Sequence, residues 1–119
     1  MLWLIQRQLK SKNTASRRKA AEQLCSLPDP RALGALSEAL ADEDAEVRRL
    51  AATALGKLEN DARIEPLLTA LHDRDADVQK ATILALKKSN DERITAALVP
   101  LLRHPNAGVR GCAAFHHRR

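Results

Sequence analysis

Residues 42–57 of the chain read DEDAEVRRLAATALGK, and residues 73–88 read DRDADVQKATILALKK. Both stretches begin with acidic residues and continue into a run rich in Ala and Leu, which favour helices. The second stretch begins 31 residues after the first, so the chain repeats its pattern. A repeat of this length indicates structural units that bury their apolar faces on one another.

The same 31-residue shift aligns further columns of residues along the chain. One column contains four residues that favour helix N-caps: Asn13, Asp44, Asp75 and Asn106. Another contains leucine in three copies and histidine in the last: Leu24, Leu55, Leu86 and His117. These columns predict one helix in each of four copies, at residues 14–26, 45–58, 76–88 and 107–117.

A second helix is predicted before each of these. Its apolar residues recur at a four-residue spacing, which places them on one helix face: Ile5 and Leu9, Leu36 and Leu40, Leu67 and Leu71, Leu98 and Leu102. We expect these helices at residues 2–10, 30–41, 61–72 and 91–103, with a kink at Pro100, whose ring interrupts a regular helix. The 119 residues then form one all-α domain of four helix pairs, at residues 1–28, 29–59, 60–90 and 91–119.

The composition agrees with closely packed helices. Hydrophobic residues make up 45% of the chain and aromatic residues only 2%, so the apolar content is mostly Ala and Leu. No apolar run approaches the roughly 18 residues of a membrane span, and the apolar start is too short for a signal peptide. Two cysteines do not make a disulfide framework. We therefore expect a cytoplasmic protein that does not bind membranes.

Residues 29–57, DPRALGALSEALADEDAEVRRLAATALGK, resemble the short HEAT-like repeats of the phycobilisome-lyase type. Residues 60–88 and 91–119 match the same pattern with a few departures, and residues 1–26 form a degenerate first copy. The resemblance implies a right-handed α-solenoid, with the second helix of each pair on the concave side. It also implies a scaffold for other macromolecules rather than a defined chemistry.

The resemblance further implies a structural ladder of acidic and basic residues that links neighbouring repeats. In this sequence the ladder would pair Asp42 with Arg48, and Asp73 would join it with Arg48 or Arg110. Three positions depart from the pattern, two at the acid and one at the base: Ser11, His104 and Gln79. We therefore expect a ladder with missing members in the first, third and last copies.

No catalytic motif is present in the sequence. It lacks a Gly-rich phosphate loop, a Cys-x-x-Cys pair and an H-E-x-x-H motif, so we expect no enzymatic activity and no cofactor. One group could offer metal ligands, because Cys112 and His116 lie four residues apart on a predicted helix, beside His117 and after His104. The alternative is that Cys112 and His116 only replace small residues of the preceding copy, since no second Cys/His cluster supports a metal site.

Some columns of the second helices point away from the packed stripe and should line the concave face. They form a basic groove with two apolar positions, and we predict that it binds an acidic segment of another protein. The predicted binding residues are Arg18, Arg49, Thr53, Lys57, Lys80, Leu84, Lys87, Lys88 and Phe115. The alternative is that the cations only keep an Ala-rich solenoid in solution and that Phe115 covers its open end.

Charge is distributed unevenly, and the chain carries a net charge of +5. Residues 1–31 and 76–119 each carry +5, whereas residues 32–75 carry −5. Basic ends suit nucleic acid, but the acidic middle and the single Trp disfavour it. Nucleic-acid binding and a chromophore lyase-type role, which the resemblance implies, are therefore alternatives to protein binding. The first predicted helix presents Leu2, Trp3, Leu4 and Ile5, so one or more of these apolar groups must lie off its packed stripe. We therefore expect one terminal face to associate with a second copy or a partner.

Overall fold

The computed structural model describes residues 1–114 and folds them into eight α-helices. In chain order these are α1 (Leu2–Gln8), α2 (Thr14–Ser26), α3 (Leu33–Ala39), α4 (Ala45–Gly56), α5 (Ile64–Ala70), α6 (Ala76–Leu86), α7 (Glu92–Leu98) and α8 (Ala107–Ala113). Three 3-10 segments adjoin the first helices of the later pairs: η1 (Pro30–Ala32), η2 (Asp61–Arg63) and η3 (Val99–Arg103). The described residues contain no β-strand, and none of their helices has the length and apolarity that a membrane crossing requires.

The second helix of each pair begins at the cap that the 31-residue columns predict. The side chains of Asn13, Asp44, Asp75 and Asn106 each accept a hydrogen bond from the backbone N–H three residues further on. Each bond satisfies one of the backbone donors that the first turn of a helix leaves unpaired. The starts of all four second helices are therefore determined by local sequence.

In the fourth pair, the first helix changes its geometry where the kink was predicted. α7 ends at Leu98, and the chain continues as η3 through Pro100 to Arg103. Pro100 has no N–H to donate to a carbonyl one turn back, so the regular α-helical pattern cannot pass through it. The predicted helix at residues 107–117 ends as α8 at Ala113, and its predicted last residues, 115–117, lie outside the described part of the chain.

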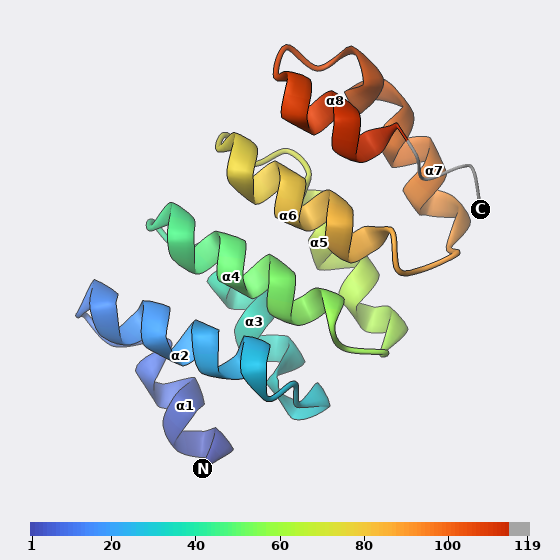
Figure 1. Cartoon of the computed structure of the whole chain (residues 1–119). Helices are drawn as coiled ribbons and strands as arrows, with labels where there is room; N and C mark the ends of the chain where they lie inside the picture. Colours follow the sequence, from blue (N-terminus) through green and yellow to red (C-terminus); the bar gives the residue numbers. More distant parts are fainter. Residues whose placement is uncertain (115–119) are drawn as a thin grey trace.

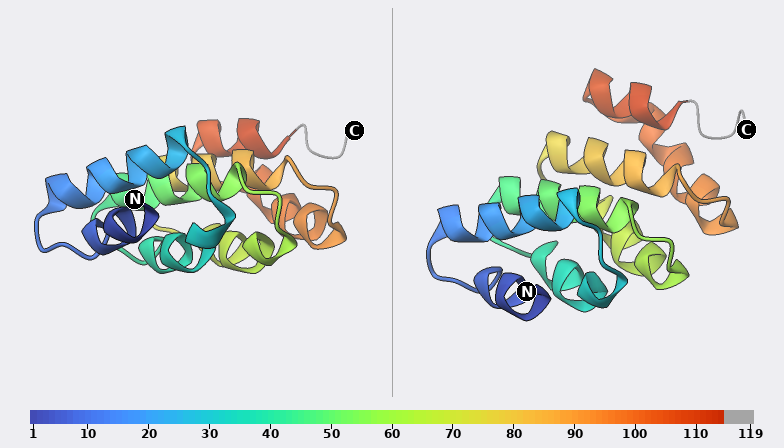
Figure 2. Two further views of the ribbon diagram at one scale, coloured as in Figure 1. Left: turned by 90° about the horizontal axis from the view of Figure 1, so that it is seen from below. Right: turned by 60° about the horizontal axis from the view of Figure 1, so that its bottom comes forward.

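The helices form two layers that run the length of the molecule (Figures 1 and 2). The second helices, α2, α4, α6 and α8, lie side by side, and each packs on the next. The first helices lie behind them: α1, α3 and α5 each pack against the second helix of their own pair, and in the last pair η3 packs against α8. The chain is therefore an all-helical α-solenoid, as predicted.

The core lies between the two layers and follows the leucine columns. Leu24, Leu55 and Leu86 of the second helices are buried, as are Leu36 and Leu67 of the first helices. Burial of each such side chain stabilises the fold by roughly 1.5–3 kcal/mol relative to exposure. Because buried residues of all four repeats form one continuous cluster, no single repeat completes its own core.

The second helices α4 and α6 approach each other closely at Gly56, at the end of α4. A Cβ atom placed on Gly56 would lie 2.6 Å from the Cβ and 2.8 Å from the Cα of Ala85 in α6. Two helix backbones approach this closely only where side chains are minimal. Gly56 is therefore required by packing, and this position belongs to the interface between repeats rather than to an open surface.

Candidate functional site

Two buried ion pairs join successive repeats on the turn side of the second helices. Arg17 Nε lies 2.9 Å from Asp42 Oδ2, and Arg48 Nε lies 2.8 Å from Asp73 Oδ2. In each pair a second guanidinium nitrogen, Nη2, approaches the other carboxylate oxygen, at 3.3 Å and 3.4 Å. Each arginine thus holds the aspartate 25 residues further on in a forked arrangement.

This geometry corrects one predicted pairing. The carboxylate of Asp42 is bound by Arg17 of the preceding repeat and not by Arg48, whose Nη1 donates instead to the backbone oxygens of Asp42 and Glu43. The reason is that Nη1 of each arginine donates to the turn of its own repeat, so that Nε and Nη2 point to the aspartate in the turn of the next repeat. Asp73 accordingly pairs with Arg48 and not with Arg110.

The predicted ladder omitted Arg17, although the sequence contains the signal for it. Arg17 occupies the same 31-residue column as Arg48 and Arg110. Like Arg48, it is buried and makes the equivalent contacts, including a hydrogen bond from Nη1 to the backbone oxygen of Ser11 at 2.9 Å.

The third arginine–aspartate position of the ladder carries neither charged residue. Gln79 and His104 stand at the same 25-residue separation as the two ion pairs. Gln79 Nε2 donates to the oxygen of Leu71, and His104 Nδ1 accepts from the backbone N–H of Asn106 at 2.9 Å. Asp73 makes the same turn contact, since its Oδ1 accepts from the N–H of Asp75. Because arginine and aspartate are replaced together, neither leaves an uncompensated buried charge, which would be costly.

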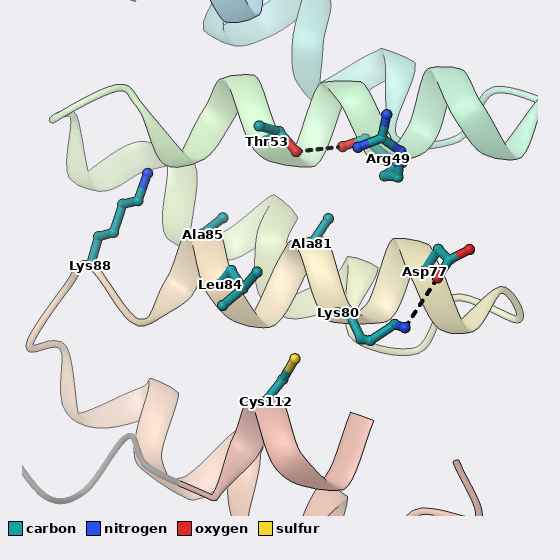
Figure 3. Close-up of a pocket in the computed structure, with 9 residues that line it drawn as sticks. All are labelled: Arg49, Thr53, Asp77, Lys80, Ala81, Leu84, Ala85, Lys88 and Cys112. Atoms are coloured by element: carbon teal, nitrogen blue, oxygen red, sulfur yellow. Dashed lines mark hydrogen bonds and ion pairs between the residues drawn. The ribbon is translucent and has the colours of Figure 1, made fainter. Parts of the chain in front are cut away.

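A groove of about 730 Å³ opens on the second-helix layer between α4, α6 and α8. Nine residues line it: Arg49, Thr53, Asp77, Lys80, Ala81, Leu84, Ala85, Lys88 and Cys112 (Figure 3). We call this the α4–α8 groove. It brings together five of the nine predicted binding residues: Arg49, Thr53, Lys80, Leu84 and Lys88.

The rim of the α4–α8 groove carries three cations with different partners. Arg49 is bound by Glu46, with Nε 2.7 Å from Oε1, and this bond holds the pKa of the Glu46 carboxyl below its ordinary value. Lys80 Nζ lies 3.2 Å from Asp77 Oδ1. Lys88 is exposed and makes no ion pair or hydrogen bond within residues 1–114.

The floor of the groove is apolar. Leu84 of α6 is 53% exposed, whereas its neighbours Ile83 and Ala85 are buried. Ala81 and Ala85 lie beside it on the same helix, and Cys112 points toward α6 from α8 (Figure 3). The groove therefore combines an exposed apolar side chain with a positively charged rim.

The remaining predicted binding residues do not line this groove. Arg18 binds Asp44 of the next repeat, with Nη2 2.8 Å from Oδ1, and this guanidinium lowers the pKa of Asp44 to about 2. Lys57 Nζ donates to the oxygen of Cys25, and Lys87 Nζ donates to the oxygen of Cys112, both at 2.7 Å. The two lysines thus reach carbonyls in the last turns of neighbouring helices, which attract cations. The fourth residue, Phe115, lies outside the described residues.

Four lining residues were not among the predicted ones. Asp77 lies three residues before Lys80, as Glu46 lies before Arg49, so helical spacing would have placed both acids at the rim. Ala81, Ala85 and Cys112 are small, and only the structure shows that the backbone leaves space above them. Residues 1–114 contain no group of His, Cys, Asp and Glu that could hold a metal, and His116 and His117 of the predicted cluster lie outside them.

Comparison with known proteins supports the repeat architecture. A sequence model of HEAT repeats matches residues 1–75 and 64–114. Among solved structures, the complex of CpcE and CpcF of phycocyanin lyase from Nostoc sp. PCC7120 aligns with a TM-score of 0.78 and 24% identity, over 98% of this chain and 64% of that one. An engineered protein from the Northeast Structural Genomics Consortium aligns with a TM-score of 0.72 and 23% identity, over 97% and 60%.

These matches confirm the predicted resemblance to HEAT-like repeats of the phycobilisome-lyase type. At such identities the solved structures show the fold alone. This chain spans less than two thirds of the length of each of them. No curated protein matches the sequence.

Proposed function

Because the chain belongs to the HEAT repeat family, we propose that it is a non-enzymatic interaction module that binds an acidic segment of another protein in the α4–α8 groove. The observation that carries the proposal is the exposed Leu84 beneath a cationic rim. HEAT repeats suggest a protein scaffold, and the CpcE and CpcF structure is itself a complex of two proteins. The proposal places the module in the cytoplasm.

The rim cations are available to a partner at low cost. Lys88 has no counterion among the described residues, and the pairs of Arg49 with Glu46 and Lys80 with Asp77 are partly exposed contacts within one helix. Such pairs are worth only a few tenths of a kcal/mol. A carboxylate of the partner can therefore exchange with Glu46 or Asp77, whereas the forked ladder pairs are buried and would resist exchange.

The apolar floor supplies what charge alone does not. A bound apolar side chain would remove Leu84 and part of Ala81 from water, at roughly 25 cal/mol per Å² of apolar area. Hot spots of protein interfaces combine such a desolvated apolar centre with a charged rim. The occupant that fits is a segment in which a large apolar side chain lies between acidic ones.

Nucleic acid fits the groove less well than an acidic protein segment. Asp77 stands among the cations of the rim, and Glu46 is paired to Arg49 at 2.7 Å. Among residues 1–114, no aromatic side chain on which a base could stack lines the groove, and Trp3 lies on α1. A mobility shift at low salt tests this alternative, because phosphate contacts are strongest there.

A chromophore lyase-type subunit is a second candidate, and the similarity to the phycocyanin lyase complex favours it. Mixing the protein with a bilin and recording its absorbance tests this function directly. An absorbance shift that the Leu84→Glu variant loses would favour a chromophore over a protein segment as the occupant of the groove.

Charge reversal tests the proposed function. We expect Lys80→Glu combined with Lys88→Glu to reduce partner capture from the native host roughly tenfold or more, since both substitutions repel an acidic segment. Lys12→Glu combined with Lys19→Glu changes the net charge equally at exposed positions outside the groove and should leave capture unchanged. Circular dichroism of both variants should equal that of the wild type. Equal loss in the control pair, or loss of helix, would contradict the assignment of these lysines to binding.

A further inference from the structure

The arginine ladder ends in an unoccupied position at the last described repeat. Arg110 belongs to the column of Arg17 and Arg48, both of which hold a carboxylate of the following repeat. No helix pair follows α7 and α8 within the described residues, and these helices form one end of the stack (Figure 1). Arg110 thus has the position of a ladder residue whose acid is not among residues 1–114.

The guanidinium of Arg110 is already held in the orientation that the ladder uses. Its Nη1 donates to the backbone oxygens of His104 at 2.7 Å and Pro105 at 3.0 Å. The Nη1 of Arg48 makes the same two contacts to its own turn, at 2.8 Å and 3.2 Å. Nε and Nη2, the two nitrogens with which Arg17 and Arg48 bind aspartate, have no partner on Arg110 among residues 1–114.

The exposure of residues in the last described repeat also differs from that of their equivalents in earlier repeats. Arg110 is exposed, whereas Arg17 and Arg48 are 7% and 3% exposed. Leu102 is 38% exposed, whereas Leu71, its equivalent in the preceding repeat, is 3% exposed. Val99 of the same 3-10 segment is also exposed. We call the surface of Val99, Leu102 and Arg110 the C-terminal face.

We propose that the C-terminal face binds a helix pair of another repeat protein that presents an aspartate in the turn between its two helices. That aspartate would take the place that Asp42 and Asp73 have within this chain, and it would accept from Nε and Nη2 of Arg110. The two apolar residues of the face would pack against the incoming helices. This inference concerns a surface other than the α4–α8 groove and does not depend on the function proposed for the groove.

A second copy of this chain does not supply the required acid. In the first repeat the ladder position is Ser11, whose Oγ accepts from the N–H of Asn13 and so keeps the turn contact without a charge. A head-to-tail pair of identical chains would place this hydroxyl opposite Arg110. A repeat chain that carries aspartate at the position of Ser11 would supply the acid that a second copy lacks.

The experiment converts this chain into such an occupant. Ser11→Asp supplies the missing carboxylate at the first repeat. Arg110→Gln in the same chain removes the guanidinium that would bind this carboxylate, so the variant should not pair with itself. We expect the S11D/R110Q variant to remain at its basal mass alone and to form a 1:1 pair with wild-type protein in sedimentation or light-scattering titrations. Its dissociation constant should be roughly tenfold or more below that of the matched S11N/R110Q control, because a forked carboxylate contact replaces a neutral amide contact.

A second experiment tests whether Arg110 is the residue that binds the introduced aspartate. The S11D/R110Q variant should fail to pair with a chain that carries only Arg110→Gln, while circular dichroism confirms that both chains are folded. Pairing with wild-type protein no tighter than that of S11N/R110Q would overturn the proposal. Equal pairing with the Arg110→Gln chain would overturn it as well, since the aspartate would then bind elsewhere.

Discussion

At the scale of single residues, the arginines of this solenoid divide into two groups by burial. The side chains of Arg48 and Asp73 are 4% and 8% exposed, whereas that of Arg18 is 49% exposed although it also binds an aspartate of the next repeat. Removing one partner of a buried pair leaves the other charge without compensation, whereas water replaces an exposed partner. The two groups should therefore differ in what they contribute to stability.

Arg48→Met should lower the free energy of unfolding by about 3 kcal/mol or more, because it leaves Asp73 charged and buried. Urea unfolding followed by circular dichroism measures this effect. Arg18→Met is the matched control, and it should cost less than about 1 kcal/mol. Equal losses in the two variants would show that the ladder does not stabilise the stack beyond an ordinary surface pair.

The pH dependence of Asp44 follows from its contact with Arg18. The hydrogen bond from Arg18 lowers the pKa of Asp44 from 3.8 to about 2. A carboxyl whose pKa is depressed by folding stabilises the folded state above its unfolded pKa, and the contribution is lost as the pH falls from about 4 through 2. In Arg18→Met the pKa of Asp44 should rise toward 3.8, which carbon-detected NMR titration of the carboxyl measures. An unchanged pKa would show that Arg18 does not hold Asp44 in solution.

At the scale of helices, α4 and α6 of the second-helix layer make a close contact at Gly56. Gly56 and Ala85 bring α4 and α6 together at a distance that leaves no space for a further methyl group. The groove that contains Leu84 begins on the same two helices. The contact therefore sets the spacing of the helices that carry the proposed binding residues.

Gly56→Ala should destabilise the fold by roughly 1–3 kcal/mol, because the added methyl would overlap with backbone atoms of Ala85. Gly34→Ala is its control, since nothing lies within 4 Å of a Cβ at that helical position. The control should be neutral or stabilise by up to about 1 kcal/mol through helix propensity. Thermal unfolding compares the two, and a neutral Gly56→Ala would contradict the close packing of α4 on α6.

The sequence was sufficient to predict the helices, but it was not sufficient to predict which side chains contact one another between repeats. The N-caps and leucine columns predicted every second helix because they act within one turn. The 31-residue alignment identifies equivalent residues but not partners, which is why Asp42 was paired with Arg48 when Arg17 binds it. Which aspartate an arginine binds, here the one 25 residues further on, depends on how one helix pair stacks on the next. Lys57 and Lys87 were predicted for the groove, but carbonyls of neighbouring helices hold them elsewhere.

At the scale of the whole molecule, the two ends of the stack differ in chemistry. The C-terminal face carries a cation in ladder position, and the first helix exposes Trp3 and Leu4 by 67% and 43%. Arg7 lies over the Trp3 ring, 5.5 Å from its centroid. An exposed tryptophan beside an exposed leucine suits an apolar contact with another chain.

Self-association through a terminal face stays a prediction. Light scattering at increasing protein concentration should show a rise in mass, and Trp3→Ala combined with Leu4→Ser should abolish it by removing the exposed apolar groups of α1. A strict monomer at high concentration would contradict this prediction.

The central claim is that a protein partner lies over Leu84 in the α4–α8 groove. A photo-crosslinking amino acid at position 84, introduced into the protein in its native host, tests this most directly, with the same group at exposed Thr95 of α7 as the control. We predict that position 84 crosslinks one protein with an acidic segment, that position 95 does not, and that Lys80→Glu with Lys88→Glu removes the product. Crosslinks to nucleic acid, equal crosslinks from both positions, or none from position 84 would contradict the account.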